Sequence, residues 1–145
     1  MSRFGKPLAL IVVGVLIAAS PVPRCDIDGA LTMQHGCTKA VADSLRSKTG
    51  AETVALLCNR LVRYTNQCQP SGAESVDSLV AMIRLDGAYG AAAAYATLGK
   101  RTRANRFMAL ARTEAGRLIL LTKPGDHLRG FAQDILRRSG PERLY

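Results

Sequence analysis

The stretch CDIDGALTMQHGCTKAVADSLRSKTGAETVALLCNRLVRYTNQC, residues 25–68, holds all four cysteines of this 145-residue chain. Apolar and small residues recur in both of its halves at the spacing of one helical face. Only the short polar segment SKTG, residues 47–50, separates the two halves. Two helices joined by so short a turn run antiparallel, so the stretch predicts a helical hairpin.

This hairpin restricts how the cysteines can pair. Pairing Cys25 with Cys37 and Cys58 with Cys68 would span about 15 Å of helix, whereas a disulfide holds its α-carbons within about 7 Å. A crossed pairing would centre neither bridge on the turn. The nested pairing, Cys25 with Cys68 and Cys37 with Cys58, centres both bridges there. The sequence therefore favours two nested structural disulfides, each contributing about 3–4 kcal/mol in the loop-entropy model.

The cysteine layout resembles that of the twin-cysteine helical hairpins, the coiled-coil-helix–coiled-coil-helix proteins. The spacing departs from their usual pattern, since eleven residues separate Cys25 from Cys37 and nine separate Cys58 from Cys68. The resemblance is therefore one of geometry only.

The N-terminus has the pattern of an export signal. Arg3 and Lys6 precede an uncharged apolar run of twelve residues, 8–19. This run is shorter than the roughly 20 residues that a membrane span needs, and it suits the apolar region of a signal peptide. We expect residues 1–20 to be a signal peptide and the protein to lie in a bacterial periplasm or outside the cell. An uncleaved membrane anchor is the alternative, because Pro21 follows the expected cleavage point.

The rest of the chain predicts three more helices, and the whole an all-α bundle of four to five helices. A third helix ends at Gly99, a fourth covers residues 102–121, and Asp126 caps a short final one. Capping boxes at Thr49 and Ser71 predict where the second and third helices begin, and Gly50 is expected in a left-handed turn. We divide the exported chain into a stapled hairpin (21–70), a three-helix region (71–138) and a flexible tail (139–145).

Residues 88–116 resemble a single tetratricopeptide-type helical hairpin. The small, aromatic and turn-forming residues of that pattern are matched by Ala92, Tyr95, Gly99, Ala104 and Ala111. No second copy lies 34 residues upstream. The resemblance implies a role in protein–protein interaction.

Motifs for catalysis and for cofactors are absent from the sequence. Cys25, His35 and Cys37 lack the close pairs of a zinc site, and neither Gly-x-Ser-x-Gly nor His-Glu-x-x-His occurs. We expect no metal and no cofactor, and we expect that the protein is not an enzyme. A small periplasmic hydrolase that uses His35 or His127 is the alternative.

Positive charge is concentrated in the last third of the chain. Residues 21–98 carry seven Lys or Arg and seven Asp or Glu, whereas residues 99–145 carry eleven and four. The candidate partner-binding residues are Lys100, Arg101, Arg103, Arg106 and Arg117. A solvated helix face is the simpler interpretation of this pattern.

The functional interpretation of this charge is an exported, non-catalytic binding protein. Its partner would be an acidic protein or an anionic envelope component, either a lipid or a cell-wall polymer. Specific nucleic-acid binding is not expected, because no aromatic residues alternate with the arginines. If residues 1–20 stay attached, the protein would instead be a membrane-anchored structural or accessory subunit.

Overall fold

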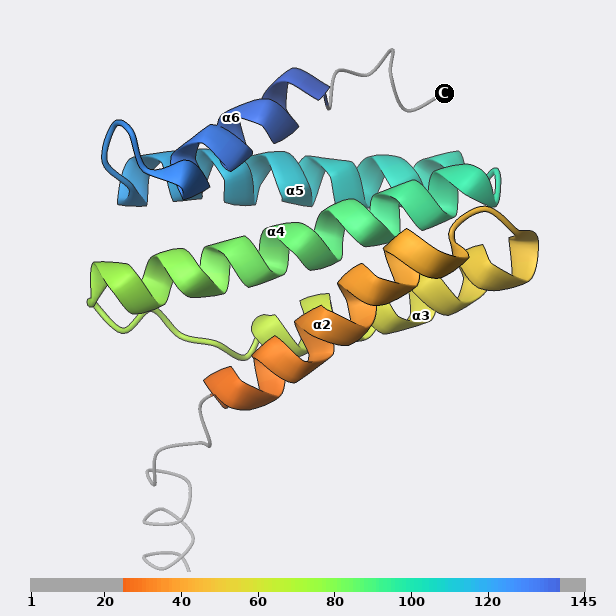
Figure 1. Ribbon diagram of the computed structural model, residues 1–145, viewed down its shortest axis with the longest axis horizontal. Helices are drawn as coiled ribbons and strands as arrows, with labels where there is room; N and C mark the ends of the chain where they lie inside the picture. The colour runs from red at the N-terminus through yellow and green to blue at the C-terminus, as the bar shows by residue number, and fades with distance from the viewer. Residues whose placement is uncertain (1–24, 139–145) are drawn as a thin grey trace, which may run out of the picture.

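A computed structural model of the protein describes residues 25–138, which form five α-helices and no strand (Figure 1). The helices are α2 (Ile27–Ser44), α3 (Lys48–Thr65), α4 (Glu74–Thr97), α5 (Arg101–Leu121) and α6 (His127–Arg138). The predicted all-α bundle is therefore confirmed. The predicted signal peptide and C-terminal tail lie outside the described residues.

Helices α2 and α3 form the predicted hairpin, and both predicted disulfides join it. Cys25 pairs with Cys68 and Cys37 pairs with Cys58, with α-carbons 4.8 Å apart in each bridge. The inner bridge, Cys37–Cys58, is fully buried, whereas the outer bridge is half-buried. The nested pairing is therefore confirmed.

Helix α4 is the central helix of the bundle. It packs against α2 and α3 on one side and against α5 on the other, and α6 lies on α5 (Figure 1). Residues of α4 contribute to two cores: Ile83, Ala91 and Ala94 face the hairpin, and Leu85, Ala88 and Ala92 face α5 and α6. A helix that is buried on two sides must be apolar around most of its circumference, which explains its run of alanines.

The start of α3 differs from the prediction. Its N-cap is Ser47, whose side chain accepts a hydrogen bond of 3.0 Å from the backbone N–H of Gly50. Gly50 therefore lies inside the helix and not in a left-handed turn. A Cβ atom there would lie 1.7 Å from the carbonyl oxygen of Ser44, so close approach of the end of α2 explains the glycine. The predicted capping box at Thr49 is wrong. Ser47 has the extended backbone of an N-cap residue, and its side chain already caps the helix two residues earlier.

The start of α4 also differs, because its N-cap is Ala73, which has no capping side chain. Asp77, inside the first turn, accepts hydrogen bonds from the Ser71 backbone N–H (2.8 Å) and hydroxyl (3.0 Å). It also accepts one from the Gly72 N–H (3.2 Å). The carboxylate thus organises the loop from α3 to α4. Downstream, Gly99 ends α4 with a φ of 73°, and Asp126 caps α6, as expected.

Candidate functional site

Four of the five predicted partner-binding residues gather at the N-terminal end of α5. Lys100, Arg101, Arg103 and Arg106 are all exposed there, and we call them the α5 patch. The first three also line an open depression beside the turn between α4 and α5. Three of these side chains belong to one helical turn and the fourth to the next, so the patch is compact.

The charges of the α5 patch oppose the stability of the helix that carries them. A helix N-terminus has a partial positive charge, so cations in its first turn are unfavourable. The first turn of α5 contains no acidic residue, and the side chain of its N-cap, Lys100, makes no capping hydrogen bond. Positive potential from the helix end and from the side chains therefore adds up at this point of the surface.

One member of the patch is held by aromatic contacts. The guanidinium of Arg103 lies over the ring of Tyr95, 5.6 Å from its centroid, a cation–π arrangement. Tyr95 in turn stacks on Phe107 with ring centroids 5.5 Å apart. The ring contact limits the freedom of Arg103 while leaving the residue exposed. The two rings therefore restrict the position of this part of the patch.

The fifth predicted residue, Arg117, lies apart from the α5 patch. It follows Arg106 by eleven residues of the same helix, a separation of about 16 Å along the axis. Its side chain is half-exposed, and its Nη1 lies 3.5 Å from a carboxylate oxygen of Glu114. The structure therefore places Arg117 in a second group of charged side chains.

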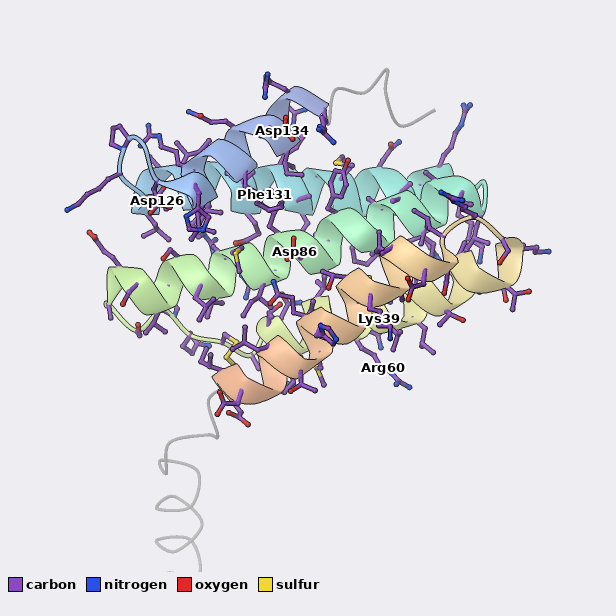
Figure 2. All side chains as sticks on the ribbon, in the orientation of Figure 1. Lys39, Arg60, Asp86, Asp126, Phe131 and Asp134 are labelled. Atoms are coloured by element: carbon purple, nitrogen blue, oxygen red, sulfur yellow. A yellow bond between two sulfur atoms is a disulfide. The ribbon has the colours of Figure 1, made fainter. Side chains whose placement is uncertain are left out.

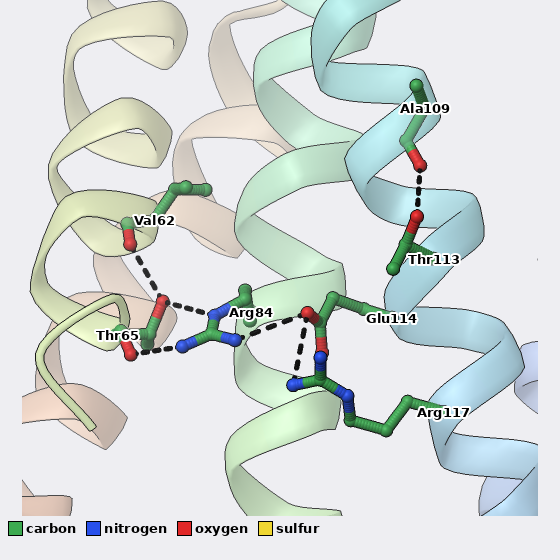
Figure 3. Close-up of polar contacts among 7 residues, drawn as sticks. All are labelled: Val62, Thr65, Arg84, Ala109, Thr113, Glu114 and Arg117. Carbon is green, nitrogen blue, oxygen red and sulfur yellow. Dashed lines mark hydrogen bonds and ion pairs between the residues drawn. The ribbon is translucent and has the colours of Figure 1, made fainter. Parts of the chain in front are cut away.

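This second group is built around a buried arginine that the sequence analysis missed. Figure 3 shows Arg84 of α4 lying between Thr65 of α3 and Glu114 of α5. Its Nη1 lies 3.2 Å from Glu114 Oε1, its Nε donates to Thr65 Oγ1 at 3.3 Å, and its Nη2 donates to the Thr65 carbonyl. The side chains of Arg84 and Glu114 are 11% and 2% exposed. Through this ion pair and these hydrogen bonds, Arg84 therefore connects three helices.

A signal for this buried pair is present in the sequence. Arg84 falls four residues after Val80 and three before Gly87, on the apolar face of α4. Glu114 falls between Ala111 and Leu118 on the buried face of α5. One cation and one anion on the buried faces of consecutive antiparallel helices indicate a buried partnership, because a lone buried charge is costly.

Glu114 is incompletely paired within the described part of the chain. Its Oε1 lies near both Arg84 and Arg117, whereas its buried Oε2 has no hydrogen-bond partner among the described residues. A buried acceptor without a donor costs about 1–3 kcal/mol. The network thus combines two guanidinium groups with one carboxylate and leaves one positive charge in excess.

Two other carboxylates have shifted pKa values. Asp86 of α4 accepts a hydrogen bond of 2.6 Å from Gln34 of α2, and burial raises the pKa of Asp86 above 3.8 despite that bond. The pKa of Asp77 is lowered, chiefly by the hydrogen bond from the Ser71 backbone N–H. The Asp86 carboxyl therefore ionises less readily than a free aspartate, and the Asp77 carboxyl ionises more readily.

The two histidines lie on different elements, α2 and α6. His35 is exposed. The side chain of His127 is 91% exposed, with Nδ1 3.6 Å from Asp126, which Figure 2 places where α5 leads into α6. The depression around His127 is lined by no Ser, Thr or Cys. No observation at either histidine favours the hydrolase alternative.

Within residues 25–138, no group of three or more His, Cys, Asp and Glu side chains is arranged to hold a metal ion. In the same part of the chain, no helix combines the length and the apolar character that a membrane crossing requires. Two disulfides are typical of proteins in an oxidising compartment outside the cytoplasm.

Helices α4 and α5 form an antiparallel pair over the residues that resemble a tetratricopeptide-type hairpin (Figure 1). Any short helical hairpin has this arrangement, so the family resemblance stays a prediction. Comparison of the chain with protein-family models, with curated proteins and with solved structures finds no match.

Proposed function

We propose that the protein is an exported, non-catalytic binding protein whose α5 patch contacts an anionic component of the cell envelope, a lipid or a cell-wall polymer. The second candidate partner is an acidic protein, which would also present negative charge to the patch. The observation that carries the proposal is the clustering of Lys100, Arg101, Arg103 and Arg106 at the N-terminal end of α5.

The arrangement of the patch supports a binding role over simple solubility. Cations spread over the surface would keep the protein soluble without destabilising the N-terminus of a helix. Here they gather where the helix dipole adds to their potential, and Tyr95 holds Arg103 in place. Placing charge against local stability is typical of a surface that is selected for contact with a partner.

Export is supported by the disulfides and by the signal-like residues 1–20. If cleavage occurs, the mass of the protein from its native compartment will lack about twenty residues, and its cysteines will be alkylated only after reduction. A full-length mass would support the anchored alternative. Freely alkylated thiols in the native protein would contradict export.

The binding proposal is tested with a variant in which all four patch residues are replaced by glutamine. We expect wild-type protein to bind vesicles of anionic phosphatidylglycerol or an isolated anionic cell-wall polymer, and not phosphatidylcholine vesicles. Binding should weaken as salt rises, because salt screens exposed charges beyond about 10 Å at 0.1 M. The patch variant should lose most of this binding.

The matched control replaces four exposed cations of the hairpin region, Lys39, Arg46, Arg60 and Arg63, with glutamine. It removes the same net charge from other parts of the surface, so it should retain binding if the α5 patch is the contact. An equal loss of binding in both variants would show that binding depends on net charge alone, and it would refute the proposal. Wild-type protein that binds neither anionic surface would leave only the acidic protein as partner.

A further inference from the structure

A cavity opens beside the buried ion pair, and residues of the loop from α3 to α4, of α4 and of α5 line it. Its volume is about 250 Å³. The apolar part of its wall comes from Pro70, Val80, Ala81 and Leu121. Both guanidinium-bearing residues of the network, Arg84 and Arg117, also line it. The cavity therefore combines an apolar chamber with a cationic wall.

The cationic wall is not neutralised by its own carboxylate. Arg84 and Arg117 share a single partner oxygen, Oε1 of Glu114, at 3.2 and 3.5 Å. Asp77 also lines the cavity and its negative charge offsets part of this positive charge, but its two oxygens are already engaged by three hydrogen bonds from Ser71 and Gly72. Arg117 is the more accessible of the two arginines, with half of its side chain exposed. It is therefore placed to meet an anion that enters the cavity.

The dimensions and the chemistry of the cavity define a ligand class. Guanidinium groups match carboxylates in geometry and bind them through paired hydrogen bonds. An apolar cavity of about 150 Å³ accommodates benzene, so one of 250 Å³ has room for about ten non-hydrogen atoms in proportion. We propose that this cavity binds a small monocarboxylate with an apolar body, its carboxylate on Arg117 and Arg84 and its body against Val80, Ala81 and Leu121.

This site is separate from the α5 patch, because Arg117 lies about 16 Å along α5 from Arg106. The two proposals can therefore fail independently. Vesicle binding depends on the patch residues, whereas carboxylate binding depends on residues that line the cavity.

The test is a calorimetric titration of the full-length protein with octanoate, which has the expected head group and about ten non-hydrogen atoms. We expect saturable binding with one site per chain. Octanol, which lacks the charge, and acetate, which lacks the apolar body, should each bind at least tenfold more weakly. Octylammonium, with the opposite charge, should not bind.

Two substitutions locate the site. Arg117→Gln should weaken octanoate binding about tenfold or more, because it removes a charged hydrogen-bond donor. Val80→Phe should abolish binding by filling the cavity. Arg112→Gln, which changes an exposed arginine of the same helix outside both the cavity and the α5 patch, is the matched control and should leave the affinity unchanged. Circular dichroism of each variant verifies that the fold is retained.

Absence of saturable octanoate binding to the wild type would overturn the proposal. So would equal affinities of wild type and Arg117→Gln, or an equal loss in Arg112→Gln and Arg117→Gln. If Val80→Phe does not fold, Leu121→Ala provides the second measurement, since enlarging the chamber should shift preference toward decanoate. An unchanged chain-length preference in that variant would contradict the assignment of the apolar wall.

Discussion

Gly90 of α4 faces Cys58 of α3 so closely that a Cβ atom on Gly90 would lie 2.8 Å from the Cys58 sulfur. The same atom would lie 3.3 Å from the sulfur of Cys37. The central helix therefore rests directly on the inner disulfide, and only glycine permits this approach. The disulfide thus supports the core as well as closing the hairpin.

Gly90→Ala is expected to destabilise the protein by about 1–3 kcal/mol, because the bridged sulfur cannot move away from an added methyl group. This loss should exceed the gain of up to about 1 kcal/mol in helix propensity. Gly116→Ala in α5 is the matched control, since nothing lies within 4 Å of its added Cβ, and it should stabilise the protein. Urea unfolding measures both, and a Gly90→Ala variant as stable as wild type would contradict the close packing.

Arg84→Met should cost about 3–5 kcal/mol in stability, because it leaves Glu114 as a buried charge whose remaining ion-pair partner within residues 25–138 is the half-exposed Arg117. The double variant Arg84→Met/Glu114→Leu should recover most of that stability. Arg137→Gln, which breaks the exposed pair with Asp134 on α6 (Figure 2), should cost at most about 1 kcal/mol. Equal losses in the single and double variants would show that the charge on Glu114 is not the cause.

The two disulfides should differ in their rates of reduction by a mild reductant. The outer bridge, Cys25–Cys68, is half-buried and the inner bridge, Cys37–Cys58, is fully buried, and a thiolate must reach the sulfur that it attacks. Alkylation followed by peptide mass analysis should therefore find Cys25 and Cys68 labelled first. In denaturant, where access is equal, this order should disappear. Early labelling of Cys37 under native conditions would contradict the structure.

Asp86 should make the protein less stable as pH rises. Its folded-state pKa lies above the ordinary value of 3.8 because of burial. The folded state therefore binds more protons between those two values, and stability falls across that window. Asp86→Asn should lack this fall, so its stability relative to wild type should increase from acid to neutral pH. A constant difference across a pH series of urea unfolding experiments would refute the assignment.

Asp77 should have the opposite effect. Hydrogen bonds from Ser71 and Gly72 lower the pKa of Asp77 in the folded state below its ordinary value of 3.8. Its contribution to the stability of the fold is therefore fully present above pH 3.8 and is lost as the pH falls through the folded-state pKa. Asp77→Asn should be less stable than wild type near neutral pH and equally stable in strong acid. The same unfolding series measures this difference, and a deficit that persists in acid would point to lost packing instead.

The sequence alone determined the helices and the pairing of the four cysteines in two disulfides. Periodicity of apolar residues is a property of neighbouring positions, and the reach of a disulfide then leaves few pairings between two antiparallel helices. The nested bridges, the end of α4 at Gly99 and the cap of α6 at Asp126 all followed from these local rules. The α3 start was missed because Ser47 and Thr49 are both suitable N-caps and Gly50 suits a turn. Only the hydrogen bond from Gly50 to Ser47 and the close approach of Ser44 to Gly50 show where the helix begins.

Only the tertiary structure decided which charged groups act together. Arg84 and Glu114 lie 30 residues apart, and their contact depends on how α4 and α5 are rotated and aligned along their axes. The same alignment brings Arg117 to the cavity. A sequence gives the face of a helix on which a charge lies, but the partner of that charge is set by the packing of a second helix.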